Sequence, residues 1–138
     1  MKRVCYLLLA ILLLTACNSG QKLSMKDIIE AFDNKGIKLI DKNEHVNYFE
    51  LNGKKAITYK LDNGENISIY LFNSEKNRIK GLDDFNKQAS KYDMPVPSIY
   101  EVENVLILYW YNGETGSATQ YDATITEAVE ALAIMFNS

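Results

Sequence analysis

The side chains with the greatest potential for chemistry are two cysteines and one histidine. Cys5 lies in an apolar N-terminal run, Cys17 follows Ala16, and His45 ends the polar segment 41–45. The chain has no Gly-x-Ser-x-Gly sequence, and no other motif indicates a serine or cysteine catalytic triad. Zinc takes three or four Cys, His or acidic ligands. We therefore expect no enzyme activity, no metal and no cofactor, and we interpret His45 as a solvated loop residue.

Paired carboxylates are the other groups that could do acid–base chemistry. Asp83 and Asp84 are adjacent on an expected helix, and Glu101 and Glu103 share one face of an expected strand. Glycoside hydrolysis needs two carboxyl groups placed across a groove, and nothing in the spacing singles out such a pair. The segment 62–66 lacks the ligand spacing of a calcium loop. Solvated faces are the favoured interpretation, and a small envelope hydrolase using Glu101 or Glu103 is the alternative.

Aromatic residues gather around the last expected strands. Tyr and Trp combine a large contact area with a polar tip, which suits stacking on sugars or peptides. In one interpretation they pack between a sheet and its helices. In the other they form a partner surface on an uncovered sheet face. The candidates for this partner surface are Tyr70, Phe72, Trp110 and Tyr121.

The N-terminal segment has the architecture of a secretory signal. Two basic residues, Lys2 and Arg3, precede an apolar run over residues 4–14, and small residues come directly before Cys17. This order is typical of a cleaved signal peptide. The run is shorter than the roughly 20 apolar residues of a membrane span. We predict cleavage between Ala16 and Cys17.

The sequence Leu14-Thr15-Ala16-Cys17 resembles the lipobox of bacterial lipoproteins. The resemblance implies that a diacylglyceryl group alkylates the Cys17 thiol and that Cys17 becomes the acylated first residue. Two acyl chains hold a protein stably in a bilayer, whereas one holds it only marginally. We expect the mature protein on the outer face of the bacterial cytoplasmic membrane, anchored through Cys17. The alternative is an ordinary cleaved signal with a coincidental cysteine.

The rest of the chain is expected to be one acidic domain. Removing 16 of the 138 residues leaves 122, enough for one domain with a real core. Loss of the two basic residues changes the formal net charge from −3 to −5. Nucleic-acid binding needs clustered basic residues, so we expect no nucleic-acid partner. We divide the mature chain into a lipidated flexible tether, residues 17–23, and an α+β domain, residues 24–138.

The first half of this domain is expected to contain a helix followed by three strands. Ser24-Met25-Lys26-Asp27 approximates a capping box, and Gly36 suits the end of the helix. Asn52-Gly53 and Asp62-Asn63-Gly64 are hairpin signals between β-branched and aromatic runs. We predict a three-stranded antiparallel meander over residues 46–51, 56–61 and 67–72, with residues 37–40 as a candidate edge strand.

A second helix is expected from Ser74 to about Tyr92. Its apolar stripe would include Ile79 and Phe85, and Gly81 would mark a close approach of this helix to the sheet.

The last part of the chain is expected to contain one or two strands and a helix. Residues 105–111 are apolar on both faces and belong in the middle of a sheet. Residues 98–102 form a separate strand or the start of one bent strand, and Thr124 opens the last helix with a capping box. The order α-β-β-β-α-β(β)-α indicates an α+β fold. It has a mainly antiparallel sheet of about four to six strands, with the helices packed on one face.

Residues 49–111 resemble small lipoproteins of Bacillus-type Gram-positive bacteria. The resemblance implies an envelope location and brings no activity, cofactor or catalytic residue. We hypothesise a non-catalytic binding or accessory module of the cell envelope, with an envelope protein or a small ligand as partner. A small-ligand carrier is a further alternative. The resemblance rests on Leu51-Asn52-Gly53, Ser68-Ile69-Tyr70-Leu71-Phe72, Arg78-Ile79-Lys80-Gly81-Leu82 and the segment 100–107.

Overall fold

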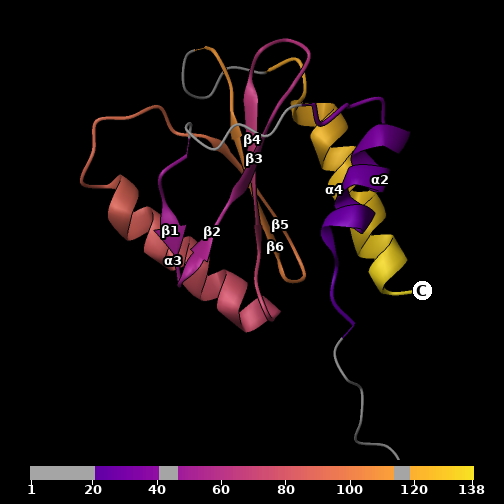
Figure 1. Ribbon diagram of the computed structural model, residues 1–138, viewed down its shortest axis with the longest axis horizontal. Coiled ribbons are helices and arrows are strands. Elements are labelled where there is room, and N and C mark those ends of the chain that lie inside the picture. Colours follow the sequence, from indigo (N-terminus) through magenta and orange to yellow (C-terminus); the bar gives the residue numbers. More distant parts are fainter. Residues whose placement is uncertain (1–20, 41–46, 114–118) are drawn as a thin grey trace, which may run out of the picture.

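Figure 1 shows a computed structural model of the chain, which describes residues 21–40, 47–113 and 119–138. Cys5, Ala16, Cys17 and His45 lie outside the described residues. The predictions of signal cleavage, of lipid attachment and of a solvated histidine therefore stay predictions.

Three helices and six short strands make up the described part of the chain. The helices are α2 (Met25–Asn34), α3 (Glu75–Ala89) and α4 (Asp122–Phe136). The strands are β1 (Glu50–Leu51), β2 (Lys54–Lys55), β3 (Ile57–Lys60), β4 (Asn66–Leu71), β5 (Ser98–Val102) and β6 (Val105–Trp110). The last four form an antiparallel sheet in the order β3-β4-β6-β5, and β1 pairs with β2 in a separate hairpin. The α+β class and, broadly, the order of elements are confirmed.

The sheet is covered on both faces, which corrects the expectation of helices on one face. Helices α2 and α4 cover one face, and α3 with the β1–β2 hairpin covers the other (Figure 1). In β6, Ile107 and Tyr109 belong to the core under α2 and α4, whereas Leu106 and Leu108 belong to the core under α3. All four are 0% exposed. Because the central strand is apolar on both faces, one layer of helices would leave half of it in water.

The Asn52-Gly53 turn forms as predicted, but its hairpin lies outside the main sheet. Asn52 has φ 46° and Gly53 φ 71°, the positive values that a type I′ turn requires. The hairpin packs on α3, where Gln88 Nε2 donates to the Glu50 carbonyl at 2.9 Å. The chain crosses to the main sheet at Ala56, between β2 and β3. The predicted three-stranded meander is therefore wrong in its first strand, whereas its second hairpin is confirmed, because β3 pairs antiparallel with β4.

The other strand predictions have mixed outcomes. Residues 37–40 do not form a strand, although the Ile40 N–H donates to the Lys60 carbonyl at the edge of β3, at 3.0 Å. Residues 98–102 and 105–110 are two strands rather than one, joined by a tight turn in which Glu103 has φ 48°. The turn brings β6 back alongside β5, so β6 takes the central position that its apolar sequence predicts.

Two helices begin where the sequence predicts. The Ser24 hydroxyl accepts from the Asp27 N–H at 3.4 Å, and the Ser24 N–H donates to the Asp27 carboxylate at 2.7 Å, which completes the capping box of α2. Gly36 follows this helix with φ 77°. Ser74 caps α3 through the Asn77 N–H at 3.2 Å.

Helix α4 begins earlier than predicted. It starts at Asp122, so Thr124 lies inside it and does not cap it. Instead, the Asp122 N–H donates to the Thr119 hydroxyl at 3.2 Å, and the Thr119 N–H donates to the Asp122 carboxylate at 3.3 Å. These reciprocal bonds between Thr119 and Asp122 form the kind of cap that was predicted at Thr124, but they form it before the helix begins.

The buried face of α3 differs from the predicted apolar stripe. Ile79 is 54% exposed, whereas Arg78 is only 7% exposed. Arg78 is buried because its side chain binds the β5–β6 hairpin: its guanidinium pairs with Glu101, and its Nε donates to the Glu103 carbonyl at 2.7 Å. Gly81 makes the close approach to the sheet that was predicted for it, against Phe72.

Candidate functional site

The predicted partner surface is not assembled as expected. Tyr70 is 0% and Phe72 3% exposed, because α3 and the β1–β2 hairpin cover their face of the sheet. Tyr121 belongs to the core on the opposite face. Of the four candidates, Trp110 alone remains partly exposed. The structure therefore keeps Tyr70, Phe72 and Trp110 on one face of the sheet, puts Tyr121 on the other, and buries all but Trp110.

Burial of Tyr70 is accompanied by hydrogen bonds. Its hydroxyl donates to the Phe49 carbonyl at 2.8 Å and accepts from Asn47 Nδ2 at 2.9 Å. Burial raises the pKa of the Tyr70 phenol above its usual value, and the bond from Asn47 opposes this only in part. Tyr70 thus holds the segment that precedes β1 against the sheet.

Trp110 opens onto a groove that its predicted neighbours do not line. The groove has a volume of about 610 Å³ and lies between α3, the segment before β1 and the connector after α3. We call it the aromatic groove. Its lining residues are Tyr48, Phe49, Gln88, Tyr92, Asp93, Met94, Pro95 and Trp110.

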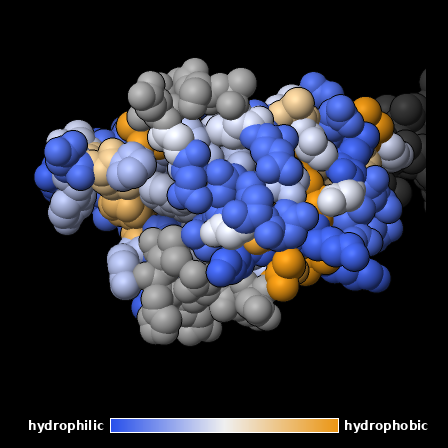
Figure 2. Space-filling model, turned by 90° about the horizontal axis from the view of Figure 1, so that it is seen from above, coloured by the Kyte–Doolittle hydropathy of each residue, from blue (hydrophilic) through white to orange (hydrophobic). Residues whose placement is uncertain are grey.

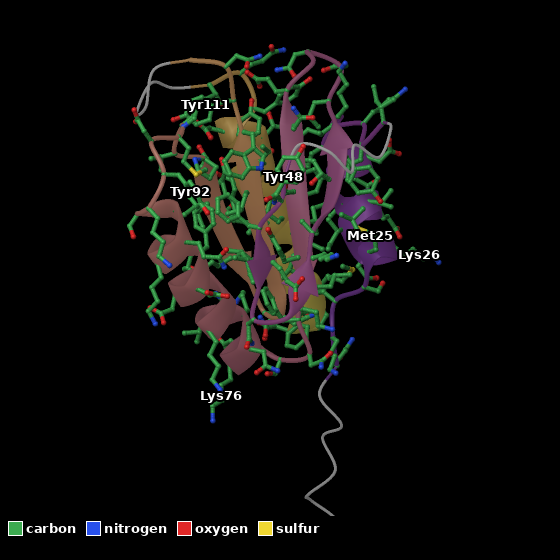
Figure 3. All side chains as sticks on the ribbon, turned by 60° about the vertical axis from the view of Figure 1, so that its left-hand side comes forward. Met25, Lys26, Tyr48, Lys76, Tyr92 and Tyr111 are labelled. Carbon is green, nitrogen blue, oxygen red and sulfur yellow. The ribbon has the colours of Figure 1, made fainter. Side chains whose placement is uncertain are left out.

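The two tyrosines of the aromatic groove are its most exposed rings. Tyr48 is 83% and Tyr92 63% exposed. In Figure 3 both lie in the upper half of the molecule, on the same side as Tyr111. Large exposed apolar groups that share a hollow are typical of binding surfaces rather than of a solvated face.

The inner wall of the aromatic groove is held in place by ring contacts and one hydrogen bond. The Phe49 and Phe85 rings meet edge to face with centroids 5.4 Å apart, and the Phe85 and Trp110 rings do so at 6.4 Å. Trp110 Nε1 donates to the Ser68 hydroxyl at 2.9 Å. Ser68 is 0% exposed and its hydroxyl also bonds the Thr58 hydroxyl at 2.8 Å. The indole ring is therefore held by a buried side chain of the sheet.

The connector after α3 extends this surface. A second hollow of about 260 Å³ lies on the other side of Tyr92, Met94 and Pro95, and Val96, which also lines it, is 55% exposed. In Figure 2, some hydrophobic atoms lie among hydrophilic ones at the left-hand end of the molecule, the side on which α3 lies in Figure 1. The connector is therefore an apolar ridge between two hollows.

The carboxylates considered for catalysis are engaged elsewhere. Glu101 pairs with Arg78, and Asp83 pairs with Lys87 at 2.5 Å on the exposed side of α3. Asp84 accepts from the Asn52 N–H at 2.9 Å, and this bond holds the pKa of its carboxyl below the usual value. Neither predicted pair converges on a hollow that could hold a substrate.

A different set of acids gathers at the end of the sheet near the β3–β4 turn. The Tyr109, Tyr121 and Tyr100 hydroxyls donate to Glu65, Asp62 and Asp122 respectively. The bond to Asp62 is the main cause that raises the pKa of Tyr121 to about 12. Burial opposes ionisation of Asp122, but the bonds from Tyr100, Ser98 and Thr119 outweigh it and lower the pKa of Asp122. These pairs join the β3–β4 turn to β6 and to the start of α4, and they join β5 to α4.

Two further findings apply only to the described residues. No group of three or more His, Cys, Asp or Glu side chains within residues 21–40, 47–113 and 119–138 is placed to hold a metal ion. Within the same ranges, no helix combines the length and the apolar character that crossing a membrane requires.

Fold and site together define an α+β domain with helices on both sheet faces and an aromatic groove beside Trp110. The chain matches no known protein family, no curated protein and no solved structure.

Proposed function

We propose that this chain is a lipid-anchored binding module of the bacterial cell envelope, which holds an envelope protein or a small ligand in the aromatic groove. The observation that carries the binding role is the exposure of Tyr48, at 83%, and Tyr92, at 63%, around one groove. The anchor is supported by the lipobox-like sequence that ends at Cys17.

The geometry of the aromatic groove favours binding. Its floor is rigid, because Phe49, Phe85 and Trp110 contact one another edge to face. A preorganised aromatic wall loses little conformational entropy when a ligand binds. Its rim carries polar groups from Gln88 and Asp93 that can orient a ligand. A binding role is favoured over hydrolysis because Glu101 is committed to Arg78.

Site-specific photo-crosslinking in intact cells tests the binding role. A photoreactive phenylalanine replaces Tyr92 in the full chain. Ile79, which is 54% exposed on α3 and lies outside the groove lining, serves as the matched control position. We expect a discrete adduct from position 92, detected by mass spectrometry, and none from position 79. The Tyr48→Ala substitution should reduce the adduct from position 92. The same adducts from both positions would contradict the proposal.

Mass analysis of the protein extracted from membranes tests the anchor. The expected mature chain begins at Cys17 and carries a diacylglyceryl group on sulfur. The Cys17→Ala variant should lose both the lipid and processing at that position. A wild-type protein that begins before residue 17, or that carries a free thiol there, would contradict the anchor without affecting the binding experiment.

A further inference from the structure

The folded domain begins at a fixed place, at the end of the sheet formed by the β5–β6 turn. The Leu23 N–H donates to Asn104 Oδ1 at 2.9 Å, and Asn104 Nδ2 donates to the Leu23 carbonyl at 3.1 Å. Leu23 itself is only 5% exposed. Gln21 and Lys22 share a hollow of about 200 Å³ with Phe136, in the last turn of α4. The chain therefore enters the domain beside the end of α4.

Helices α2 and α4 are antiparallel neighbours. The Lys35 ammonium, at the end of α2, pairs with Glu127 near the start of α4 at 3.3 Å. The first turn of α2 must then lie beside the last turns of α4, as Figure 1 shows. The start of α2, the end of α4 and the entry of the chain thus form one end of the molecule, which we call the entry end.

The entry end exposes large apolar side chains. Ile134 is 70% and Met135 43% exposed, both in the last turn of α4. Ile29 in α2 is 41% exposed, and the antiparallel pairing places it at the level of Ile134. The core clusters do not include these three side chains, which are exposed to water in the isolated domain and which we call together the apolar patch.

Three exposed lysines also lie at or near the entry end. Lys22, Lys26 and Lys76 are exposed, and Figure 3 shows Lys76 at the lower end of the molecule, with Lys26 pointing outward from α2. Acidic side chains lie at this end as well: Glu103 lines the same hollow as Lys22, and exposed Glu30 follows Ile29 in α2. Two further acids are engaged within the fold. Asp27 completes the capping box of α2, and Glu75 pairs with Arg78 at 3.2 Å. The apolar side chains rather than the charge therefore suit this end to the headgroup region of a bilayer, where exposed lysines can reach the lipid phosphates.

We propose that the entry end docks on the bilayer surface, with Ile134, Met135 and Ile29 in the headgroup region. This inference rests on the proposed lipid anchor. The four residue-to-residue steps from Cys17 to Gln21 span at most about 14 Å when fully extended, so an acylated Cys17 would keep the entry end close to the membrane. Lysine ammonium groups would then reach the lipid phosphates while their methylene chains lie along the apolar patch.

The same orientation turns the aromatic groove away from the membrane. Strand β6 runs from Val105, next to the entry end, to Trp110 at the groove, and its six residues span about 20 Å. A ligand in the groove would therefore approach from outside the membrane, with the domain between it and the bilayer.

Depth-dependent fluorescence quenching tests this orientation. The purified lipidated protein is placed in phosphatidylcholine vesicles that contain a quarter phosphatidylglycerol and a headgroup nitroxide quencher. Acylation consumes the Cys17 thiol and the mature chain has no other cysteine, so single-cysteine variants label cleanly. Ile134→Cys reports on the entry end, and Tyr92→Cys is the matched position in the groove. Both residues are more than 60% exposed, so the substitutions leave the core intact.

We expect several-fold stronger quenching and a blue-shifted emission at position 134, because an interfacial side chain lies about 5–10 Å into the headgroup boundary. Equal quenching at the two positions, or stronger quenching at position 92, would overturn the proposed orientation. Failure of the anchor gives a different result: the protein does not float with the vesicles, and a free thiol labels at Cys17 before any cysteine is introduced.

Discussion

Gly81 of α3 lies directly against the ring of Phe72, at the end of β4. A Cβ added at Gly81 would come within 2.3 Å of Phe72 Cζ and 2.6 Å of Cε1. No side chain other than hydrogen fits this helix-to-sheet contact, which sets how closely α3 covers its face of the sheet. A tight approach of α3 is in turn what buries Tyr70 and leaves Trp110 at the edge.

The Gly81→Ala variant should therefore lose stability although alanine is the better helix former. Alanine gains about 1 kcal/mol in a helix interior, but overpacking against Phe72 costs about 1–3 kcal/mol. We expect a net loss in the free energy of unfolding, measured by urea denaturation. Lys80→Ala, on the exposed side of the same turn, is the control. If Phe72→Leu does not relieve the loss in the double variant, the contact is not its cause.

Asn104 is the second structural constraint that can be tested. Its amide bonds both backbone groups of Leu23, and Nδ2 also donates to the Phe72 carbonyl at 3.2 Å. Asn104→Ala would leave these buried groups without partners, at about 2–3 kcal/mol in unfolding free energy. Asn86→Ala, on the exposed side of α3, should stay within about 0.5 kcal/mol of wild type. Equal effects from the two would show that the amide does not hold the chain entry.

Most predictions that came from local signals were confirmed, although the capping box at Thr124 was not. The capping box at Ser24, the cap at Ser74 and the Asn52-Gly53 turn each depend on a few neighbouring residues, whose conformational preferences are present in any context. The close approach at Gly81 could also be predicted from the sequence. Glycine destabilises a helix interior by about 1 kcal/mol relative to alanine, so its presence there indicates a packing constraint.

The predictions that failed depended on contacts between distant segments. Arg78 replaced Ile79 on the buried face of α3 because its charge meets Glu101 on β5, and helical periodicity carries no information about that partner. Likewise, Tyr48 and Tyr92 meet only because the β1–β2 hairpin folds onto α3. The sequence signal that could have found the groove was the pair of prolines, Pro95 and Pro97, which hold an apolar segment outside both helix and sheet.

Alkaline pH should destabilise the fold through its buried tyrosines. A folded-state pKa of about 12 for Tyr121, above the unfolded value near 10, gives stability that is fully present below pH about 10 and is lost as pH rises towards 12. Burial raises the pKa of Tyr100 and Tyr109 in the same direction. The urea midpoint should fall steeply above pH 10, while phenolate absorbance reports the ionisation.

Tyr121→Phe isolates one part of this pH dependence. The variant loses the bond to Asp62, at about 1 kcal/mol in neutral solution, and no longer has a phenol to ionise. Its stability should therefore fall less between pH 10 and 12 than that of wild type. Tyr48→Phe, at a ring that is 83% exposed, is the matched control and should follow the wild-type profile. A Tyr121→Phe profile that is parallel to wild type would show that this phenol does not contribute.

The aromatic groove allows stability and binding to be separated by residue. Tyr48 and Tyr92 are mostly exposed, so Tyr48→Ala and Tyr92→Ala should each change the free energy of unfolding by no more than about 0.5 kcal/mol. Trp110→Ala should cost about 3 kcal/mol, because it removes packing on Phe85 and the donor to buried Ser68. If the tyrosines are present for binding, their variants lose the crosslinked adduct while their urea midpoints stay at the wild-type value. A large loss of stability from either tyrosine variant would instead assign that ring to the core.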